Sequence, residues 1–552
     1  MWVLHFAVVV SLLGLHTTWS HRYKEPTVGV AILLRNKEHT LPEFLTCLNQ
    51  LDYPKKRMIY SDYNRDNTTG VVESWLKVHG HRYHEVVFTK NSTDLADFPD
   101  EQHYEFWSPL HYKHVIQLRQ QALDYARYRW VDYLLMLDAD VFLTDKNTIS
   151  SLISKNVPIV GPMLVSQGQY SNFWCAMTPE YYYARHPDYS ALVLRRRQGC
   201  FPVPMLHSAL LISLHTWPSD RLAYNPSKMP FYNGPDDDII AFAVNAGVFG
   251  IKMYVCNDHL YGFVSEPMDG VGDLAAEKQR LINVRLEAAG KGVILPVEPP
   301  LSIRRRRPSK LGCDAIFFIN LARRTRRREL MIYSFEQLGM DVIRREAVDG
   351  TTLNINDLGN GIHLMAEYRD PYHDRPMKAG EVGCFLSHYN IWTEIVEKGL
   401  DITLVLEDDV RFAPDFRNHF HALLADLDHL DWDFVYLGRK ILMSEGETQV
   451  TSRVSKPLYS YWTLGYLVSR RGALRLIEAN PLRNLLPVDE YIPIMFDAHP
   501  NTSWKLKFPR RNLVAYSSVP LLVTPTHYTG EPGYVSDTED SKLLRANIVH
   551  QL

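Results

Sequence analysis

The stretch LLMLDADVFL, residues 134–143, places two carboxylates, Asp138 and Asp140, directly after an apolar run. The stretch TLVLEDDVRF, residues 403–412, repeats the pattern with three acids: Glu407, Asp408 and Asp409. Continuous apolar runs of this length are typical of parallel strands that are buried on both faces. In open α/β sheets, ligands bind at the carboxyl ends of such strands, so we expect both sets of acids at a binding edge.

Each half of the chain also opens in the same way. An apolar, β-branched stretch, TVGVAILLRN at 27–36 and AIFFINLARR at 315–324, is followed by a stretch of helical period. Strand, turn and helix together begin a βαβ unit. Because similar features recur in the same order, we predict two tandem copies of one α/β fold.

A chain of 552 residues has room for two large domains. Residues 292–310, GVILPVEPPLSIRRRRPSK, contain four prolines and four successive arginines, which is typical of an exposed linker. We therefore predict a signal peptide at 1–20, an N-terminal domain at 21–295, a linker at 296–311, a C-terminal domain at 312–530 and a tail at 531–552.

The first twenty residues contain an apolar run from Val8 to Leu15 and end in Ser20, as in a cleaved secretory signal peptide. A short membrane anchor is the alternative, although the run is shorter than the roughly 20 residues that a span needs. No later stretch is typical of a transmembrane helix. Three glycosylation sequons agree with a lumenal route: Asn67, Asn91 and Asn501.

Composition excludes some classes of function. The net charge of -3 offers no electrostatic argument for nucleic acid as a partner. Six cysteines are too few for a disulfide scaffold, although one or two disulfides could form. None of the cysteines makes a CXXC pair, so a cysteine zinc site is not expected.

Closely spaced carboxylates repel each other unless a cation lies between them. Mn²⁺ and Mg²⁺ take hard oxygen ligands and leave positions open for phosphate oxygens. Such a metal neutralises the charge that develops on a leaving diphosphate, as in glycosyl transfer from a nucleotide sugar. The alternative is a set of strand-terminal acids that cap a helix or form salt bridges. The strand context and the duplication favour the metal.

The second half resembles glycosyltransferase family 25 through FFINLARRTRRRELM, YRDPYHDRPMKAGEVGCFLSHYNIW, LVLEDDVRF and LLPVDEYIPIMFDAHP. The resemblance to its animal procollagen galactosyltransferases continues in the first half through SNFWCAMTPEYYY and MYVCNDHLYGF. It covers about residues 27–538. The resemblance implies two tandem type-A glycosyltransferase domains of Rossmann-like fold and transfer of galactose from UDP-galactose to 5-hydroxylysine of collagen with Mn²⁺. It also implies an inverting reaction, which needs a general base for the acceptor hydroxyl.

The candidate residues follow from these roles. Metal and diphosphate would be held by Asp138 and Asp140 in the first domain, and by Glu407, Asp408, Asp409 and His527 in the second. The nucleotide would lie near Arg35, Asn36, Asn320, Arg323 and Arg324. The base is sought among Asp489, Glu490, Asp237 and Asp238. Simpler structural roles are the alternatives: a helix start for the arginines, a helix N-terminus for Asp237 and Asp238, and a structural histidine for His527. We expect the second domain to be the catalytic one, because it carries the fuller set.

The resemblance implies the endoplasmic reticulum lumen, yet the chain ends in LLRANIVHQL, which is no Lys-Asp-Glu-Leu type retrieval signal. Collagen is the expected acceptor, and lysyl hydroxylase or a second copy of the chain are candidate partners. Two rival functions stay open. One is a catalytically inactive relative that serves in adhesion or as a binding partner, and the other is a transferase that uses another UDP-sugar.

Overall fold

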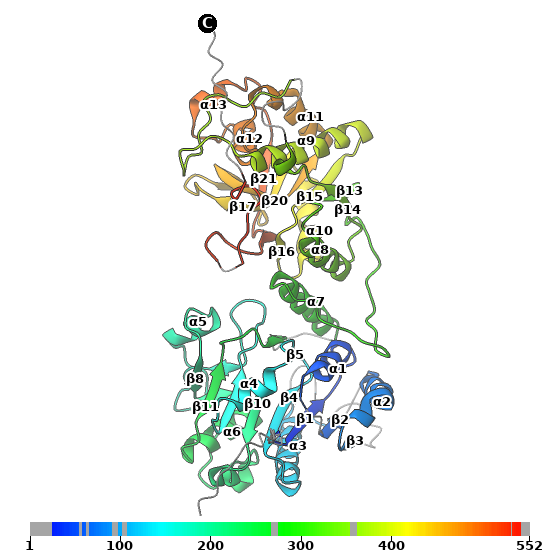
Figure 1. The fold of residues 1–552 in the computed structure, drawn as a ribbon, viewed down its shortest axis with the longest axis vertical. Helices are drawn as coiled ribbons and strands as arrows, with labels where there is room; N and C mark the ends of the chain where they lie inside the picture. Colours follow the sequence, from blue (N-terminus) through cyan, green and yellow to red (C-terminus); the bar gives the residue numbers. More distant parts are fainter. Residues whose placement is uncertain are drawn as a thin grey trace, which may run out of the picture.

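The computed structural model describes residues 25–53, 58–61, 66–90, 98–101, 107–266, 274–353, 361–531 and 533–541. The expected signal peptide and the sequon at Asn91 lie outside these residues. The described residues form two α/β domains that follow one another along the longest axis of the molecule (Figure 1). The prediction of two tandem α/β domains is confirmed.

The N-terminal domain is built on an eight-stranded sheet of order β3-β2-β1-β4-β10-β6-β11-β8. At its centre β1 lies parallel to β4, and β10 lies antiparallel to the other edge of β4. Its strands are β1 (Val28–Leu34), β2 (Met58–Ser61), β3 (Phe88–Lys90), β4 (Tyr133–Asp138), β5 (Val141–Leu143), β6 (Ile159–Pro162), β7 (Phe173–Trp174), β8 (Cys200–Val203), β9 (Met205–Leu206), β10 (Ala209–Ser213), β11 (Met253–Cys256) and β12 (Gly262–Val264). Its helices are α1 (Leu41–Gln50), α2 (Thr68–His79), α3 (Pro109–Tyr128), α4 (Thr148–Ile153), α5 (Pro187–Val193), α6 (Asp238–Val248) and α7 (Leu274–Gly290).

The C-terminal domain has a second eight-stranded sheet, of order β14-β13-β15-β20-β17-β21-β19-β18. Its strands are β13 (Ala315–Asn320), β14 (Ile343–Glu346), β15 (Ile402–Leu406), β16 (Val410–Phe412), β17 (Phe434–Ile441), β18 (Thr448–Gln449), β19 (Val454–Lys456), β20 (Ser460–Ser469), β21 (Ala515–Ser518) and β22 (Val523–Pro525). Its helices are α8 (Thr325–Leu338), α9 (Ala379–Lys398), α10 (Phe416–Leu427), α11 (Arg470–Glu478), α12 (Val488–Met495) and α13 (Thr502–Leu506).

The two domains repeat one pattern around their acidic turns. β13 lies parallel to β15 and β20 lies antiparallel to it, as β1 and β10 do beside β4. After each acidic turn the chain forms a short strand, β5 or β16, which pairs antiparallel with a late strand, β12 or β22. The apolar residues of β4 and β15 are buried, apart from the half-buried Ile402 at the start of β15, as expected for central strands of an α/β sheet. The acids therefore emerge at the carboxyl end of a central strand in both domains.

Helix α7 lies between the domains and contacts both (Figure 1). Arg285 on α7 donates to Glu43 Oε1 of α1 at 2.6 Å and to Gln337 Oε1 of α8 at 3.1 Å. Glu287 on α7 forms an ion pair with Arg411 in β16. These polar contacts and the packing of α7 on α8 join the two domains.

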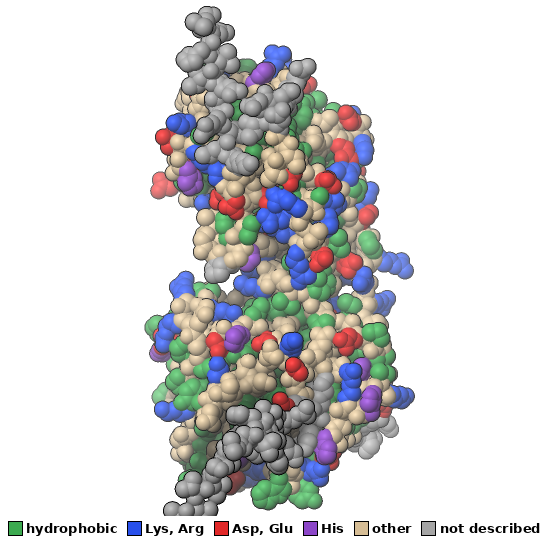
Figure 2. All heavy atoms as spheres, in the orientation of Figure 1, with side chains coloured by type: hydrophobic (Ala, Val, Ile, Leu, Met, Phe, Trp, Pro, Cys, Tyr) green, Lys and Arg blue, Asp and Glu red, His purple; other side chains and the backbone are tan. Residues whose placement is uncertain are grey.

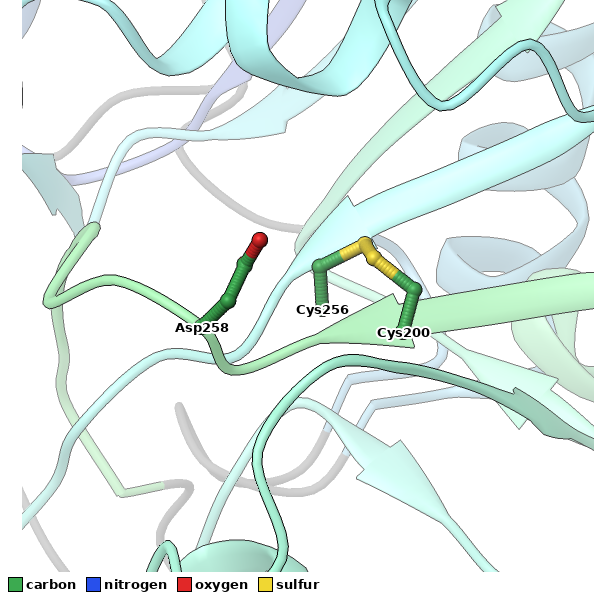
Figure 3. Close-up of side chains that lie close together, drawn as sticks. All are labelled: Cys200, Cys256 and Asp258. Carbon is green, nitrogen blue, oxygen red and sulfur yellow. A yellow bond between two sulfur atoms is a disulfide. The ribbon is translucent and has the colours of Figure 1, made fainter.

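One disulfide fastens the outer edge of the first sheet. Cys200 in β8 and Cys256 in β11 are register partners and are bonded, as Figure 3 shows. Asp258 lies close to them, but Lys155 and Tyr261 donate to its carboxylate at 2.6 and 2.7 Å. Because both sulfur atoms are in the disulfide, this group does not offer thiolate ligands to a metal.

Charged side chains of both signs are interspersed over the face of the molecule in Figure 2, as expected for a net charge of -3. Within the described ranges, no helix combines the length and the apolar character that crossing a bilayer requires.

Candidate active site

The C-terminal acidic turn lies between β15 and β16. Asp408 accepts hydrogen bonds from the Asn320 amide at 2.6 Å and from Arg327 Nη1 at 3.1 Å. Arg327 also lies 3.4 Å from Asp409 Oδ2. The other oxygen, Asp409 Oδ1, is buried without a hydrogen-bond partner among the described residues. A buried, unpaired carboxylate oxygen is costly unless a ligand completes it.

Burial raises the pKa of Asp409 to about 7, and the neighbouring acids Glu407 and Asp408 add to the effect against the opposing charge of Arg327. Glu407 behaves differently. Burial alone would raise its pKa, but a hydrogen bond and charge from His388 and a hydrogen bond from Thr463 hold the pKa below its usual value. Thr463 Oγ1 donates to Glu407 at 2.6 Å. The site thus favours the charged form of Glu407 and disfavours the charged form of Asp409. A bound cation would favour the ionised form of both.

His527 lies in the same cleft as the acids. The cleft is lined by Arg327, Asp408, Asp409, His527 and Gly533, among others. Burial lowers the pKa of His527, which favours the neutral imidazole that metals bind. Carboxylate oxygens from the acids and a nitrogen from His527 are donor types that suit Mn²⁺, so the chemistry of the cleft fits the expected metal.

The predicted nucleotide-binding residues of the second domain are divided. Arg323 lines a neighbouring cleft, Arg324 lines the cleft that contains His527, and Asn320 donates to Asp408. The neighbouring cleft is also lined by Arg327, Asp349 and residues 534–538, together with the acidic turn. Arg323 and Arg324 do not project freely, because both form ion pairs with Asp537 at 2.7 and 2.6 Å. Val535 O accepts from Arg327 at 2.7 Å. Residues 534–538, which follow the expected domain boundary at 530, therefore form a wall of the cleft.

Two adjacent acids at the start of α12 have different environments. Glu490 is 2% exposed and accepts from Tyr459 at 2.8 Å, Tyr461 at 2.5 Å and His499 at 2.8 Å. These contacts hold the Glu490 carboxylate in a buried hydrogen-bond network. Asp489 is partly exposed, and burial together with the charges of Glu407 and Glu490 raises its pKa to about 8.

His388 belongs both to the core and to the lining of the neighbouring cleft. His388 is buried on α9, its Nδ1 lies 2.8 Å from Tyr466 Oη, and its Nε2 lies 3.5 Å from Glu407. Trp392 Nε1 donates to the same Tyr466 hydroxyl at 3.1 Å. These contacts connect Glu407 through His388 to the buried Tyr466 and Trp392.

The N-terminal acidic turn is paired differently. Arg119 of α3 donates to Asp138 Oδ1 at 2.9 Å and forms an ion pair with Asp238 at the start of α6. Arg119 is only 7% exposed. Lys37 Nζ lies 3.4 Å from Asp140 Oδ2. Burial raises the pKa of Asp140, and the charge of Lys37 opposes the shift.

The remaining candidates of the first domain have structural partners. Asp237 caps α6, because its side chain accepts from Ile240 N at 2.9 Å. Arg35 donates to Glu101 Oε1 at 2.9 Å, and Asn36 is buried at the end of β1 with φ 55°. Sequence reasoning missed Arg119, Arg327, Thr463 and Asp537. Only Arg327 left a signal, because it lies one helical turn beyond Arg323.

Comparison with known proteins assigns both halves of the chain to one enzyme family. Residues 25–285 match the N-terminal domain of glycosyltransferase family 25, and residues 313–492 match glycosyltransferase family 25 (LPS biosynthesis protein). A glycosyltransferase 25 family member of Anopheles gambiae is 46% identical over 94% of this chain and 89% of its own length. Human procollagen galactosyltransferase 2 is 44% identical over 94% of this chain and 84% of its own length.

A relative from mouse has a different name. Inactive glycosyltransferase 25 family member 3 is 44% identical over 94% of this chain and 88% of its own length. Among solved structures, a mannosyltransferase of Pyrobaculum calidifontis aligns with 50% of this chain and 66% of its own, with 14% identity and a TM-score of 0.26. That likeness is too weak to carry a functional conclusion.

Proposed function

This chain is a hexosyltransferase of glycosyltransferase family 25, and we propose that it transfers galactose from UDP-galactose to 5-hydroxylysine of collagen chains at the C-terminal acidic turn. The names of its procollagen galactosyltransferase relatives support galactose as the transferred sugar and procollagen as the acceptor, while UDP as the carrier and hydroxylysine as the acceptor residue are part of the proposal. The observation that carries the choice of domain is the buried, unpartnered Asp409 Oδ1 in a cleft that also contains His527 and Arg327.

A divalent metal, Mn²⁺ or Mg²⁺, fits this site. Asp409 and His527 would hold it, with Glu407 and Asp408 close by, and it would neutralise charge on the leaving diphosphate. The residues of the chain do the remaining work. Arg327 offers a cation at the rim of both clefts, and Arg323 and Arg324 bring further positive charge to the nucleotide side.

Asp489 is the proposed general base. In an inverting reaction the acceptor oxygen attacks the anomeric carbon of galactose as the bond from that carbon to the diphosphate breaks. The proton of the acceptor hydroxyl then passes to Asp489, and UDP leaves. A base with a pKa near the working pH is the most effective, and the raised pKa of Asp489, about 8, meets that condition. Glu490 is less suited, because its oxygens already accept three hydrogen bonds.

The proposed location is the lumen of the secretory pathway. The Cys200–Cys256 disulfide supports it, because disulfides persist in oxidising compartments. The signal peptide at 1–20, the glycans at the sequons, and partnership with lysyl hydroxylase or a second copy of the chain are parts of the same proposal. Cleavage near Ser20 and the glycans can be checked by mass spectrometry of the secreted chain.

A donor screen tests the function directly. The full chain is purified and assayed with UDP-galactose, UDP-glucose and other UDP-sugars, a hydroxylysine-containing collagen peptide, and Mn²⁺ with or without EDTA. We expect transfer from UDP-galactose that EDTA abolishes. Preference for another donor would change the substrate, and a folded chain without turnover would place it with its inactive relative from mouse.

A further inference from the structure

Three aromatic side chains of the C-terminal domain gather around Lys440 or one another and come from segments close to the proposed site. Trp462 is in β20, Tyr372 is in the loop before α9, and Tyr528 follows β22. Tyr372 is 61% exposed and Tyr528 is 46% exposed. We call these three residues, with Lys440 of β17, the aromatic ledge.

The members of the ledge form one continuous surface. Lys440 Nζ lies 5.8 Å from the ring centroid of Tyr372 and 5.6 Å from that of Trp462, so the cation joins the two rings. The Trp462 and Tyr528 centroids are 5.9 Å apart. Tyr372 in turn meets Tyr461 edge to face at 5.7 Å. An exposed run of aromatic rings on a soluble domain marks a binding surface.

The backbone at Trp462 is strained in a way that connects the ledge to the proposed base. Trp462 has φ 72°, a conformation that bulky residues rarely adopt. The pairing of β17 with β20 shifts register nearby, between Gly438 and Lys440, as in β-bulges that redirect side chains beside active sites. The backbone of Trp462 partly offsets the raised pKa of Asp489. Strain of this kind persists where it serves a function, and here one residue both acts on Asp489 through its backbone and contributes its ring to the ledge.

The neighbours of the ledge place it at the edge of the reacting centre. Thr463, next to Trp462, donates to Glu407, and Tyr528 directly follows His527 of the metal cleft. Two segments of the ledge therefore continue directly into residues of the proposed site. Glu407 keeps its negative charge, which suits the ammonium group of a hydroxylysine, whereas Lys440 repels further cations.

We propose that the aromatic ledge docks the acceptor chain, which binds there as an extended polyproline II segment. This inference rests on the proposed function, because it takes collagen as the acceptor. Polyproline II chains are pre-ordered and rich in imino acids, and grooves lined by aromatic rings recognise them through ring packing. The residues flanking the hydroxylysine lie on Tyr372, Trp462 and Tyr528, while the hydroxylysine side chain extends toward Asp489.

The test separates acceptor from donor binding. Tyr372→Ala and Tyr528→Ala each raise the KM for a hydroxylysine-containing collagen peptide by roughly tenfold, as expected for loss of one well-packed ring. The KM for UDP-galactose and the slow hydrolysis of UDP-galactose without peptide stay unchanged. Tyr528→Phe, which keeps the ring, retains the wild-type KM. Tyr182→Ala in the N-terminal domain is the matched control, because Tyr182 is also 61% exposed.

Two results would overturn the proposal. An unchanged peptide KM in the Tyr372→Ala, Tyr528→Ala double variant would show that the ledge does not bind the acceptor. A raised KM for UDP-galactose would show that the rings stack on the donor sugar instead. If the wild-type chain has no turnover, the proposed function fails, and calorimetric titration of the same variants with the collagen peptide still decides whether the ledge binds it. Thermal melting confirms that each variant is folded.

Discussion

The two acidic turns occupy the same place in two copies of one fold, but they differ in what neutralises them. In the N-terminal domain, Arg119 is buried between Asp138 and Asp238. In the C-terminal domain, the arginine is Arg327 on α8, whose side chain is 25% exposed at the rim of the clefts. Asp489, at the start of α12 as Asp238 is at the start of α6, has acids among its main electrostatic neighbours.

This difference shows how a duplicated scaffold can divide structural and catalytic roles. Buried carboxylates are destabilising by several kcal/mol each unless they are paired. The N-terminal domain satisfies its acids with cations from its own chain. The C-terminal domain leaves Asp409 Oδ1 without a hydrogen-bond partner among the described residues and places Asp489 beside the charges of Glu407 and Glu490. This arrangement destabilises the free protein but leaves charge available for a metal and an acceptor proton. Buried carboxylates without a compensating cation are an unfavourable arrangement of the kind expected at functional sites.

The largest expected effect comes from removing each pair of acids. Asp408→Asn with Asp409→Asn should lower kcat/KM by at least about 10³-fold, the upper end for loss of one electrostatic group, because two are removed. Asp138→Asn with Asp140→Asn should leave kcat/KM within about threefold, since Arg119 and Lys37 already neutralise these acids. Steady-state galactosyl transfer measures both variants. Equal losses would show that both domains catalyse.

Replacing each arginine by methionine should affect the two domains in opposite ways: stability in the N-terminal domain and UDP binding in the C-terminal domain. Arg119→Met should lower the free energy of unfolding by about 3–5 kcal/mol, because it leaves Asp138 and Asp238 buried without a partner. Arg327→Met should cost about 1 kcal/mol or less, because the side chain is partly exposed, but it should weaken UDP binding. Urea unfolding and calorimetry with UDP distinguish the two. A stable Arg119→Met protein would mean that the N-terminal acids do not depend on this cation.

Substitutions of the two adjacent acids of α12 should likewise differ, one affecting turnover and the other stability. Asp489→Asn should lower kcat by about 10²–10⁴-fold with little change in stability, as expected for loss of a general base. Glu490→Gln should instead lower the unfolding free energy by about 1–3 kcal/mol, because it disrupts a buried hydrogen-bond network. Kinetics and thermal melting of both variants are the measurements. Greater loss of turnover in Glu490→Gln would transfer the role of base to Glu490.

The raised pKa of Asp489 predicts the pH dependence of the reaction. A base accepts a proton only when it is ionised, so kcat should rise with pH, about tenfold per unit, until it levels off near pH 8. The remaining activity of Asp489→Asn should lack this limb. A wild-type profile that is flat between pH 6 and 8 would contradict the assignment. A limb that persists in the variant would assign the titration to Asp409 instead, because its pKa is also raised, to about 7.

Much of the architecture could be predicted because it depends on local pattern. The apolar runs of β4 and β15 and the acids after them gave the strands, their burial and the ligand edge. The partners of those acids could not be predicted, because they depend on tertiary packing. Arg119 reaches Asp138 from α3, and Asp537 meets Arg324 across 213 positions of the chain. No spacing in the sequence indicates either contact.

Two neighbouring residues of α12 show a second reason why the site could not be predicted in full from the sequence. Asp489 and Glu490 are equivalent in the sequence, but consecutive helical side chains point about 100° apart. Glu490 therefore faces Tyr459, Tyr461 and His499, while Asp489 faces Glu407. Which of the two acids faces the site depends on the rotation of α12 about its axis where it packs against β20. The sequence pattern does not specify this rotation.

The smallest expected effect concerns Asp237, which the sequence left between catalysis and a helix cap. Asp237→Ala should lower the unfolding free energy by about 1 kcal/mol, because it removes the hydrogen bond to Ile240 N at the start of α6. Asp237→Ser keeps a capping oxygen and should retain most of the stability. Neither variant should change kcat, since the acid that faces the site from this helix is Asp238, which Arg119 already holds. Urea unfolding and galactosyl transfer measure both quantities. A loss of kcat in both variants with unchanged stability would make Asp237 part of a working N-terminal site and remove the contrast between the domains.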